Sequence, residues 1–239
     1  MRFRALRIQM VPLLVFMEAL LALSAFSQTK TLTQGANRIE IQLERMEGSQ
    51  WRAVDPGLVF IQNDLIRFQV KSNFNGYLYV LNLGTSGKYS LLFPGEASGR
   101  ENNIQADKIY TVPATSGSFR ITGPAGHEIV YWLLSPVELQ PDRVRPDLLA
   151  LPPPPEKKSP STLIPRCDES MFRARGDCID ASAGARGVED EQALPENLAG
   201  ISTIKSRELS FEKNPQTSVV VAPESAGQPI IFEFRLAHR

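Results

Sequence analysis

The sequence predicts an all-β fold, an antiparallel β-sandwich or a partly open barrel, with a Pro-rich, disulfide-stapled insertion before the C-terminal strands. Three observations support this prediction. Apolar residues recur at every second position over much of residues 37–134, Gly and Pro turns separate the apolar runs, and no segment has the periodicity of a convincing amphipathic helix. A length of 239 residues suits one such domain with a long insertion.

The first half of the chain contains strands of two kinds. Residues 39–43 and 66–70 alternate apolar with polar side chains, which predicts strands with one face in the core and one in water. Residues 77–83 and 128–134 are apolar at almost every position, which predicts central strands. Shorter strands are predicted at 89–93, 109–112 and 118–121.

Turn-forming residues separate these strands. Asn75-Gly76 precedes the strand at 77–83, and both residue types tolerate positive φ. Gly84-Thr85-Ser86-Gly87 then leads into residues 89–93. These two strands are therefore predicted to form a hairpin, which Pro94-Gly95 ends.

The C-terminal part contains three further predicted strands, at 208–211, 219–221 and 230–236. In the last one, four apolar residues share a face: Ile230, Phe232, Phe234 and Leu236. Such a strand needs a core, so residues 206–239 are predicted to return and complete the main sandwich of residues 28–140. The competing layout is a domain that ends near Pro141, followed by an independent tail.

The insertion is assigned to residues 141–205. Eight prolines lie between Pro141 and Pro165, four of them in a row from Pro152. Proline has no N–H for a ladder, so this stretch is expected to be extended, as a spacer or as a recognition segment. Residues 181–199 are small, polar and acidic, and are expected to hold a short helix at most.

Cys167 and Cys178 are the two cysteines of the chain. In an exported protein, a pair this close predicts a disulfide, with two free thiols as the alternative. The bridge is expected to staple the insertion and not the core. On the loop-entropy model, closing this loop stabilises the folded protein by about 3 kcal/mol.

Residues 1–27 are predicted to be a secretory signal peptide. Arg2, Arg4 and Arg7 precede an apolar run over 10–25, and small residues precede a cut after Ser27. The alternative is a retained membrane anchor, although Glu18 interrupts the run and sixteen residues fall short of the ~20 that a span needs. The protein is thus expected to be periplasmic, on the cell surface or secreted, with no stable membrane span after cleavage.

The hairpin region resembles a bacterial family called domain of unknown function 4384. The resemblance rests on Asn75-Gly76-Tyr77-Leu78-Tyr79-Val80-Leu81-Asn82, on Leu91-Leu92-Phe93-Pro94, on Tyr110-Thr111-Val112-Pro113 with Phe119, and on Gly123-Pro124-Ala125-Gly126-His127-Glu128. It covers about residues 50–136, more loosely the ending 232–236, and not the insertion. The resemblance implies an exported β-sandwich module and no activity.

No catalytic, cofactor-binding or metal site is predicted. His127 and His238 are the only histidines, and no zinc spacing, serine elbow, Walker loop or dinucleotide fingerprint occurs. His127 is expected to be a satisfied loop or rim residue, with a general base as the alternative. The acidic run 189–191 is expected to be solvated. Arg175-Gly176-Asp177 matches an integrin-recognition tripeptide, but a tight turn beside the disulfide is favoured. With 26 basic and 26 acidic residues, no nucleic-acid partner is expected.

The remaining candidates are aromatic. Rings at five positions could face a ligand, or could fill the core instead: Tyr77, Tyr79, Tyr89, Tyr131 and Trp132. The sequence thus favours a non-enzymatic module that binds another envelope or secreted protein. The alternative is a carbohydrate-binding module or a hydrolase acting on cell-wall or surface polysaccharide. Neither the partner nor the oligomeric state is specified.

Overall fold

The computed structural model describes residues 36–139, 165–167, 177–188, 194–199, 201, 206–224 and 227–239. All of these residues belong to one unit, residues 36–239. The predicted signal peptide, most of the Pro-rich stretch, the acidic run 189–191 and residues 175–176 of the Arg-Gly-Asp tripeptide lie outside the described residues.

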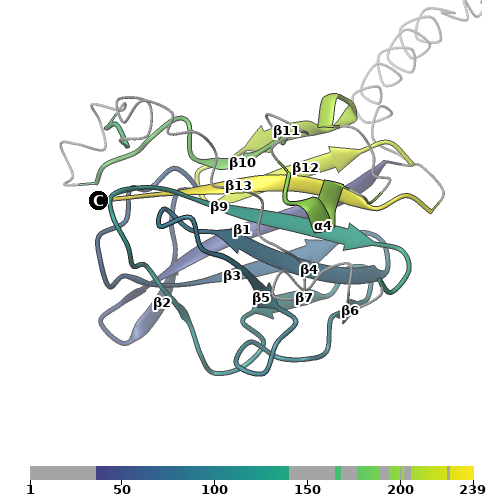
Figure 1. Ribbon diagram of the computed structural model, residues 1–239, viewed down its shortest axis with the longest axis horizontal. Helices are drawn as coiled ribbons and strands as arrows, with labels where there is room; N and C mark the ends of the chain where they lie inside the picture. Colours follow the sequence, from purple (N-terminus) through teal and green to yellow (C-terminus); the bar gives the residue numbers. More distant parts are fainter. Residues whose placement is uncertain are drawn as a thin grey trace, which may run out of the picture. The chain divides into compact units, whose positions relative to one another are not determined.

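The strands form two antiparallel sheets that do not close into a barrel (Figure 1). Sheet I has the order β11-β12-β1-β3-β7, while β2 also pairs with β1 and β8 also pairs with β3. Its strands are β1 (Asn37–Glu47), β2 (Gln50–Ala53), β3 (Leu65–Ser72), β7 (Ile109–Val112), β8 (Phe119–Arg120), β11 (Ser210–Lys213) and β12 (Thr217–Ala222).

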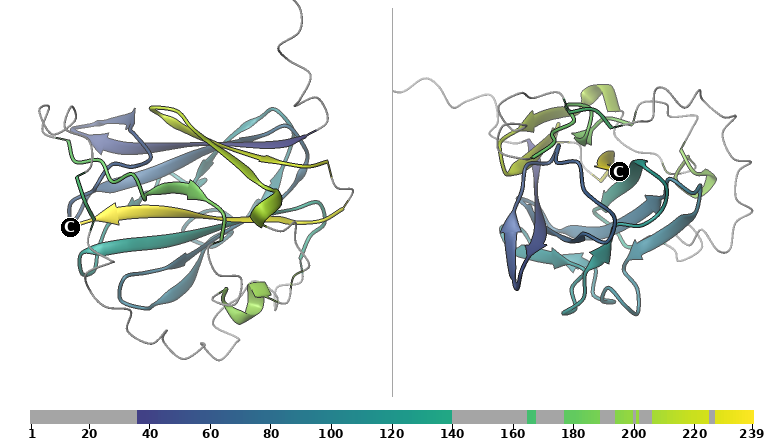
Figure 2. Two further views of the ribbon diagram at one scale, coloured as in Figure 1. Left: turned by 90° about the horizontal axis from the view of Figure 1, so that it is seen from above. Right: turned by 90° about the vertical axis from the view of Figure 1, so that its left-hand side faces the viewer.

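Sheet II has the order β10-β13-β9-β4-β5, and β6 also pairs with β4. Its strands are β4 (Gly76–Leu83), β5 (Tyr89–Phe93), β6 (Asn103–Ile104), β9 (Gly126–Ser135), β10 (Gly184–Arg186) and β13 (Ile230–His238). Two short helices complete the described elements, α4 (Glu196–Ala199) and the 3-10 turn η4 (Ser206–Glu208). The views in Figure 2 show the two sheets as separate layers.

The core lies between the layers, and the apolar residues of the predicted alternating strands fill it. Ile39, Ile41 and Leu43 point inward from β1, and the four apolar residues of β13 point inward from the other sheet. An aromatic cluster occupies the centre. Phe68 of β3 makes edge contacts with Trp132 of β9 and Phe234 of β13, with ring centroids 5.1 and 5.7 Å apart. The prediction of an antiparallel β-sandwich is confirmed.

The C-terminal strands belong to both sheets. β12 pairs with β1, and β13 pairs with β9 over nine residues. Each sheet therefore contains a strand that precedes the insertion beside a strand that follows it.

Asn75-Gly76 connects the two sheets, since β3 belongs to sheet I and β4 to sheet II. Neither residue has a positive φ. The expectation that positive φ explains this pair is therefore wrong. A Cβ on Gly76 would lie 2.7 Å from the carbonyl oxygen of Ser135, so glycine is required here because β9 passes too close for any side chain.

The outer face of sheet II is also apolar and is covered by a segment of the insertion. Tyr79, Leu81, Tyr131, Leu133 and Ile231 form this outer layer with Leu198, and all six are buried. The covering segment, residues 194–199 and 201, contains Leu198, which is 1% exposed. This second layer explains why the central strands are apolar on both faces.

Candidate functional site

Three side chains with catalytic chemistry meet where β9 begins. Nε2 of His127 lies 3.1 Å from Oδ2 of Asp180, and the hydroxyl of Ser182 donates to Oδ1 of Asp180 at 2.6 Å. The same hydroxyl lies 3.4 Å from Nε2 of His127. The backbone N–H groups of Arg166 and Ser182 also donate to the Asp180 carboxylate, at 3.0 and 2.8 Å.

The arrangement is that of a structural cross-link. In a hydrolytic relay, one ring nitrogen of the histidine base contacts the serine hydroxyl and the other ring nitrogen contacts the acid. Here Nε2 of His127 faces both Asp180 and Ser182, and the serine proton is directed to the carboxylate. Burial disfavours the charge on Asp180, yet hydrogen bonds from Ser182 and from the Arg166 backbone, together with His127, hold its pKa below the usual value. Asp180 therefore anchors the return of the insertion to β9.

The predicted disulfide is present next to this cross-link. Cys167 and Cys178 are joined, with their Cα atoms 4.8 Å apart. Cys178 is 8% exposed and packs with Val59 and Ala237, and its carbonyl accepts a 2.7 Å hydrogen bond from the Val59 backbone. The bridge joins two residues of the insertion, as expected, and it also packs against the sandwich.

A second polar cluster closes the same end of the core. Glu128 of β9 accepts hydrogen bonds from Asn82 at 2.8 Å and from Thr85 at 3.3 Å, and it lies 3.4 Å from Nε2 of His238. Burial opposes its ionisation, but His238, Asn82 and Thr85 lower the pKa of Glu128. His238 is 1% exposed. The cluster holds the end of β13 to β9.

The structure separates the five aromatic candidates. Trp132 lies in the core between the sheets and is 1% exposed, so it cannot stack on a ligand from solution. Tyr79 and Tyr131 belong to the outer layer of sheet II under the covering segment. Tyr77 and Tyr89 are half-buried beside that layer, and the hydroxyl of Tyr89 donates to Asn197 at 3.2 Å. The five rings do not form one exposed strip.

Two strand edges on one side of the sandwich have no partner in the described part of the chain. β10 lies beside β11 and β12 on the opposite side. On this side the edges are β5 of sheet II and β7 of sheet I, continued by the two-residue strands β6 and β8 (Figure 1). Neither strand contains a charged residue. Charges and bulges are the usual protection of an edge, and only β5 carries a bulge, at its register shift beside Val80 and Leu81.

The alternation of hydrogen bonds along β3 identifies which backbone groups of β7 point outward. The N–H of Asn73 donates to Arg38 of β1, so Lys71 and Gln69, at every second position, also bond toward β1. Val70 and Phe68 then bond toward β7, in register with Tyr110 and Val112. It follows that Ile109 and Thr111 direct their N–H and C=O groups away from the sheet.

The same argument applies to β5. The N–H of Gly84 donates to Lys88, and Asn82 pairs with Ser90, so Tyr89 and Leu91 direct their backbone groups outward. Sequence reasoning found the strands β5 and β7 but not their free edges. Edge position depends on strand order, which periodicity alone does not contain.

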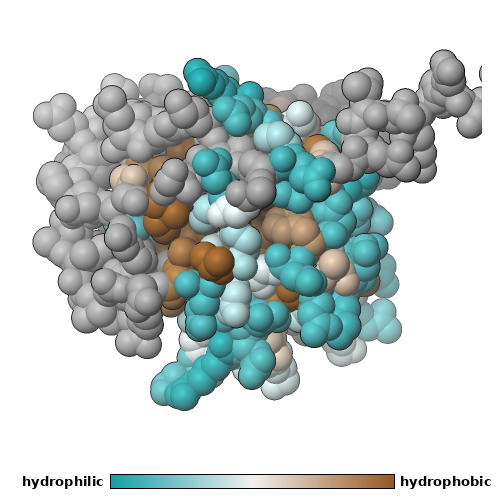
Figure 3. All heavy atoms as spheres, turned by 90° about the vertical axis from the view of Figure 1, so that its right-hand side faces the viewer, coloured by the Kyte–Doolittle hydropathy of each residue, from teal (hydrophilic) through white to brown (hydrophobic). Residues whose placement is uncertain are grey.

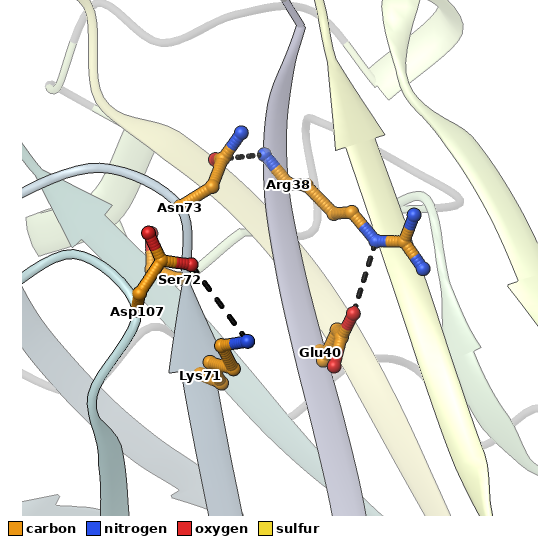
Figure 4. Close-up of a pocket in the computed structure, with 6 residues that line it drawn as sticks. All are labelled: Arg38, Glu40, Lys71, Ser72, Asn73 and Asp107. Carbon is orange, nitrogen blue, oxygen red and sulfur yellow. Dashed lines mark hydrogen bonds and ion pairs between the residues drawn. The ribbon is translucent and has the colours of Figure 1, made fainter. Parts of the chain in front are cut away.

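A shallow polar hollow lies over the outer face of sheet I near β7 (Figure 4). It is lined by Arg38, Glu40, Lys71, Ser72, Asn73 and Asp107. Its charges pair with one another: Arg38 lies 3.1 Å from Glu40, and Lys71 lies 3.7 Å from Asp107. The hollow therefore has no net charge with which to select a charged ligand.

Hydrophobic side chains reach the surface on the face shown in Figure 3. The large hydrophobic residues that the described part of the chain exposes are Ile61, Ile109 and Val137, at 53%, 65% and 60%. Among the same residues no group of His, Cys, Asp and Glu is arranged to hold a metal ion, and no helix is long and apolar enough to cross a membrane.

An open, two-layered antiparallel sheet structure with a docked disulfide segment defines a β-sandwich module. Residues 59–138 match the model of the family described as Domain of unknown function (DUF4384), which confirms the resemblance seen in the sequence. The matched region runs from before β3 to just after β9, so β1, β12 and β13 lie outside it. No curated protein and no solved structure matches the chain.

Proposed function

We propose that the chain is an exported, non-enzymatic β-sandwich module that binds another protein of the bacterial envelope or of the medium. One observation carries the proposal: one side of the sandwich keeps two uncharged strand edges, and Tyr89, Leu91, Ile109 and Thr111 direct backbone donors and acceptors outward from them. Such edges template pairing with another chain, and proteins without that function usually protect them.

Export is supported by two features. The N-terminal arginines and the apolar run over 10–25 are typical of a signal peptide. The disulfide between Cys167 and Cys178 suits an oxidising compartment. Together they favour the periplasm, the cell surface or the medium as the place of action.

A binding role without catalysis is supported by how the reactive side chains are used. The cluster of His127, Asp180 and Ser182 binds the insertion to β9, and the buried pair of Glu128 and His238 closes the core. In both assemblies the carboxylates are held by internal contacts. The carbohydrate alternative gains no support from the aromatic residues, since Trp132, Tyr79 and Tyr131 are buried.

Site-specific photocrosslinking in the native envelope tests the proposal. A photoreactive residue is placed at Leu91 or Thr111 of the full chain, expressed with its leader, and at Ile61 as the control, a more exposed position that lies outside the strands. We expect adducts with a second protein from an edge position and none from Ile61. Absence of adducts at both edges, or equal adducts at all three positions, would contradict the proposal.

A further inference from the structure

We infer that the β7 edge is the docking site, and that its occupant is an extended, uncharged segment of the partner that adds to sheet I as an antiparallel strand. This inference rests on the proposed function and specifies its partner. The β7 edge is favoured over the β5 edge for two reasons. β5 is bulged, and the side chains of Tyr89 and Leu91, whose backbone groups point outward, already pack against the outer layer of sheet II.

The backbone of β7 dictates an extended partner. Ile109 and Thr111 present two N–H and two C=O groups at the spacing of a strand, and neither residue has another backbone partner among the described residues. Only an extended polypeptide matches a row of donors and acceptors in this alternation. Every other pairing in sheet I is antiparallel, so an antiparallel strand continues its pattern.

The side chains restrict the sequence of that segment. Ile109 is 65% exposed on the outer face, opposite Lys71, and it is the most exposed of the large hydrophobic residues in the described part of the chain. An apolar or β-branched residue opposite Ile109 would cover it. Lys71 already lies beside Asp107, and β7 itself is uncharged, so β7 offers no partner for a charge in the segment, and the exposed Lys108 lies just before the strand.

The experiment uses a displayed library of short linear peptides, selected on the full chain and then measured individually. We expect enrichment of β-branched and aromatic residues at alternate positions. Ile109→Lys, which places a charge on the edge, and Ile109→Pro, which removes an outward N–H, should each weaken binding about tenfold. Ile61→Lys is the matched control and should leave the affinity unchanged, since Ile61 is similarly exposed but lies on no free edge. Thermal unfolding checks that each variant is folded.

Hydrogen exchange gives an independent reading. Bound peptide should slow exchange of the Ile109 and Thr111 amides, which have no backbone partner among the described residues, and leave those of Tyr89 and Leu91 unaffected. Failure to select any peptide, equal affinity for the Ile109 variants, or protection at β5 instead of β7 would overturn the inference. So would a concentration-dependent dimer abolished by Ile109→Lys, since the occupant would then be a second copy. If photocrosslinks at Leu91 persist in those cases, the proposed function survives while this inference fails.

Discussion

Nε2 of His127 lies 3.1 Å from Oδ2 of Asp180, although the two residues are 53 positions apart and separated by the Pro-rich stretch. His127 begins β9 of the sandwich, and Asp180 follows the disulfide. The contact therefore joins the insertion to the fold, and the energetics of this junction can be measured.

Asp180→Asn is expected to destabilise the protein by about 1–3 kcal/mol, because the carboxylate accepts several hydrogen bonds in a buried position and an amide cannot replace them all. Chemical denaturation at neutral pH measures the change. Ile61→Ala, at an exposed position, is the control and should change stability by less than about 0.5 kcal/mol.

The same carboxylate makes stability depend on pH. The pKa of Asp180 is lowered from 3.8 in the folded protein, so its contribution is complete above the unfolded value and is lost as the pH falls through the folded one. Glu128 acts in the same direction from its usual 4.5. We expect wild-type stability to decline below about pH 4.5, with a shallower decline in Asp180→Asn. Identical slopes for the two proteins would show that Asp180 is not responsible.

Replacing both cysteines, Cys167→Ser with Cys178→Ser, should cost up to about 3 kcal/mol on the loop-entropy model. The local effect is more specific. The Val59 amide, which donates to the Cys178 carbonyl, should exchange faster, while amides in the centre of β9 should change much less. Uniform acceleration throughout the sandwich would mean that the bridge supports the whole fold.

Phe68→Ala should be the most damaging of these changes, at about 3–5 kcal/mol. The ring is fully buried and contacts Phe119, Trp132 and Phe234, so its removal opens a cavity between the two sheets. Denaturant unfolding followed by tryptophan fluorescence measures the loss. A cost near that of an exposed residue would contradict the sandwich core described above.

Alkaline pH should also destabilise the protein. Desolvation, with the nearby Glu233 charge, raises the pKa of Tyr131 to about 12. A folded-state pKa above the unfolded value of about 10 contributes stability below pH 10 and loses it as the pH rises toward 12. The free energy of unfolding of Tyr131→Phe should therefore fall less steeply than that of the wild type between about pH 10 and 12. Equal alkaline profiles for the variant and the wild type would contradict this account.

Much of the fold could be predicted because periodicity reports burial directly. The alternation of Ile39, Ile41 and Leu43 gave their inward face correctly, and the two fully apolar runs became β4 and β9 in the middle of sheet II. The residues that cover sheet II could not be predicted. Leu198 lies in a small, polar stretch without periodicity, and what it packs against depends on a long-range return of the chain.

The candidate site was less predictable than the fold. His127 is expected from the sequence to be a loop or rim residue, but nothing in the sequence marks Asp180 or Ser182 as its neighbours, since the contact depends on where the insertion returns. The free edges were missed for a related reason. Ile109 reads as an ordinary strand residue, and its outward backbone groups become evident only once β7 is known to end sheet I.

The pairing of β1 with β12 and of β9 with β13 has a consequence for the order of events during synthesis. The ribosome releases β1 and β9 long before the strands that must lie against them. Neither layer can be finished until β12 and β13 have emerged, and long-range pairing of this kind makes folding slow. The polypeptide therefore stays open until the strands at residues 217–222 and 230–238 are available.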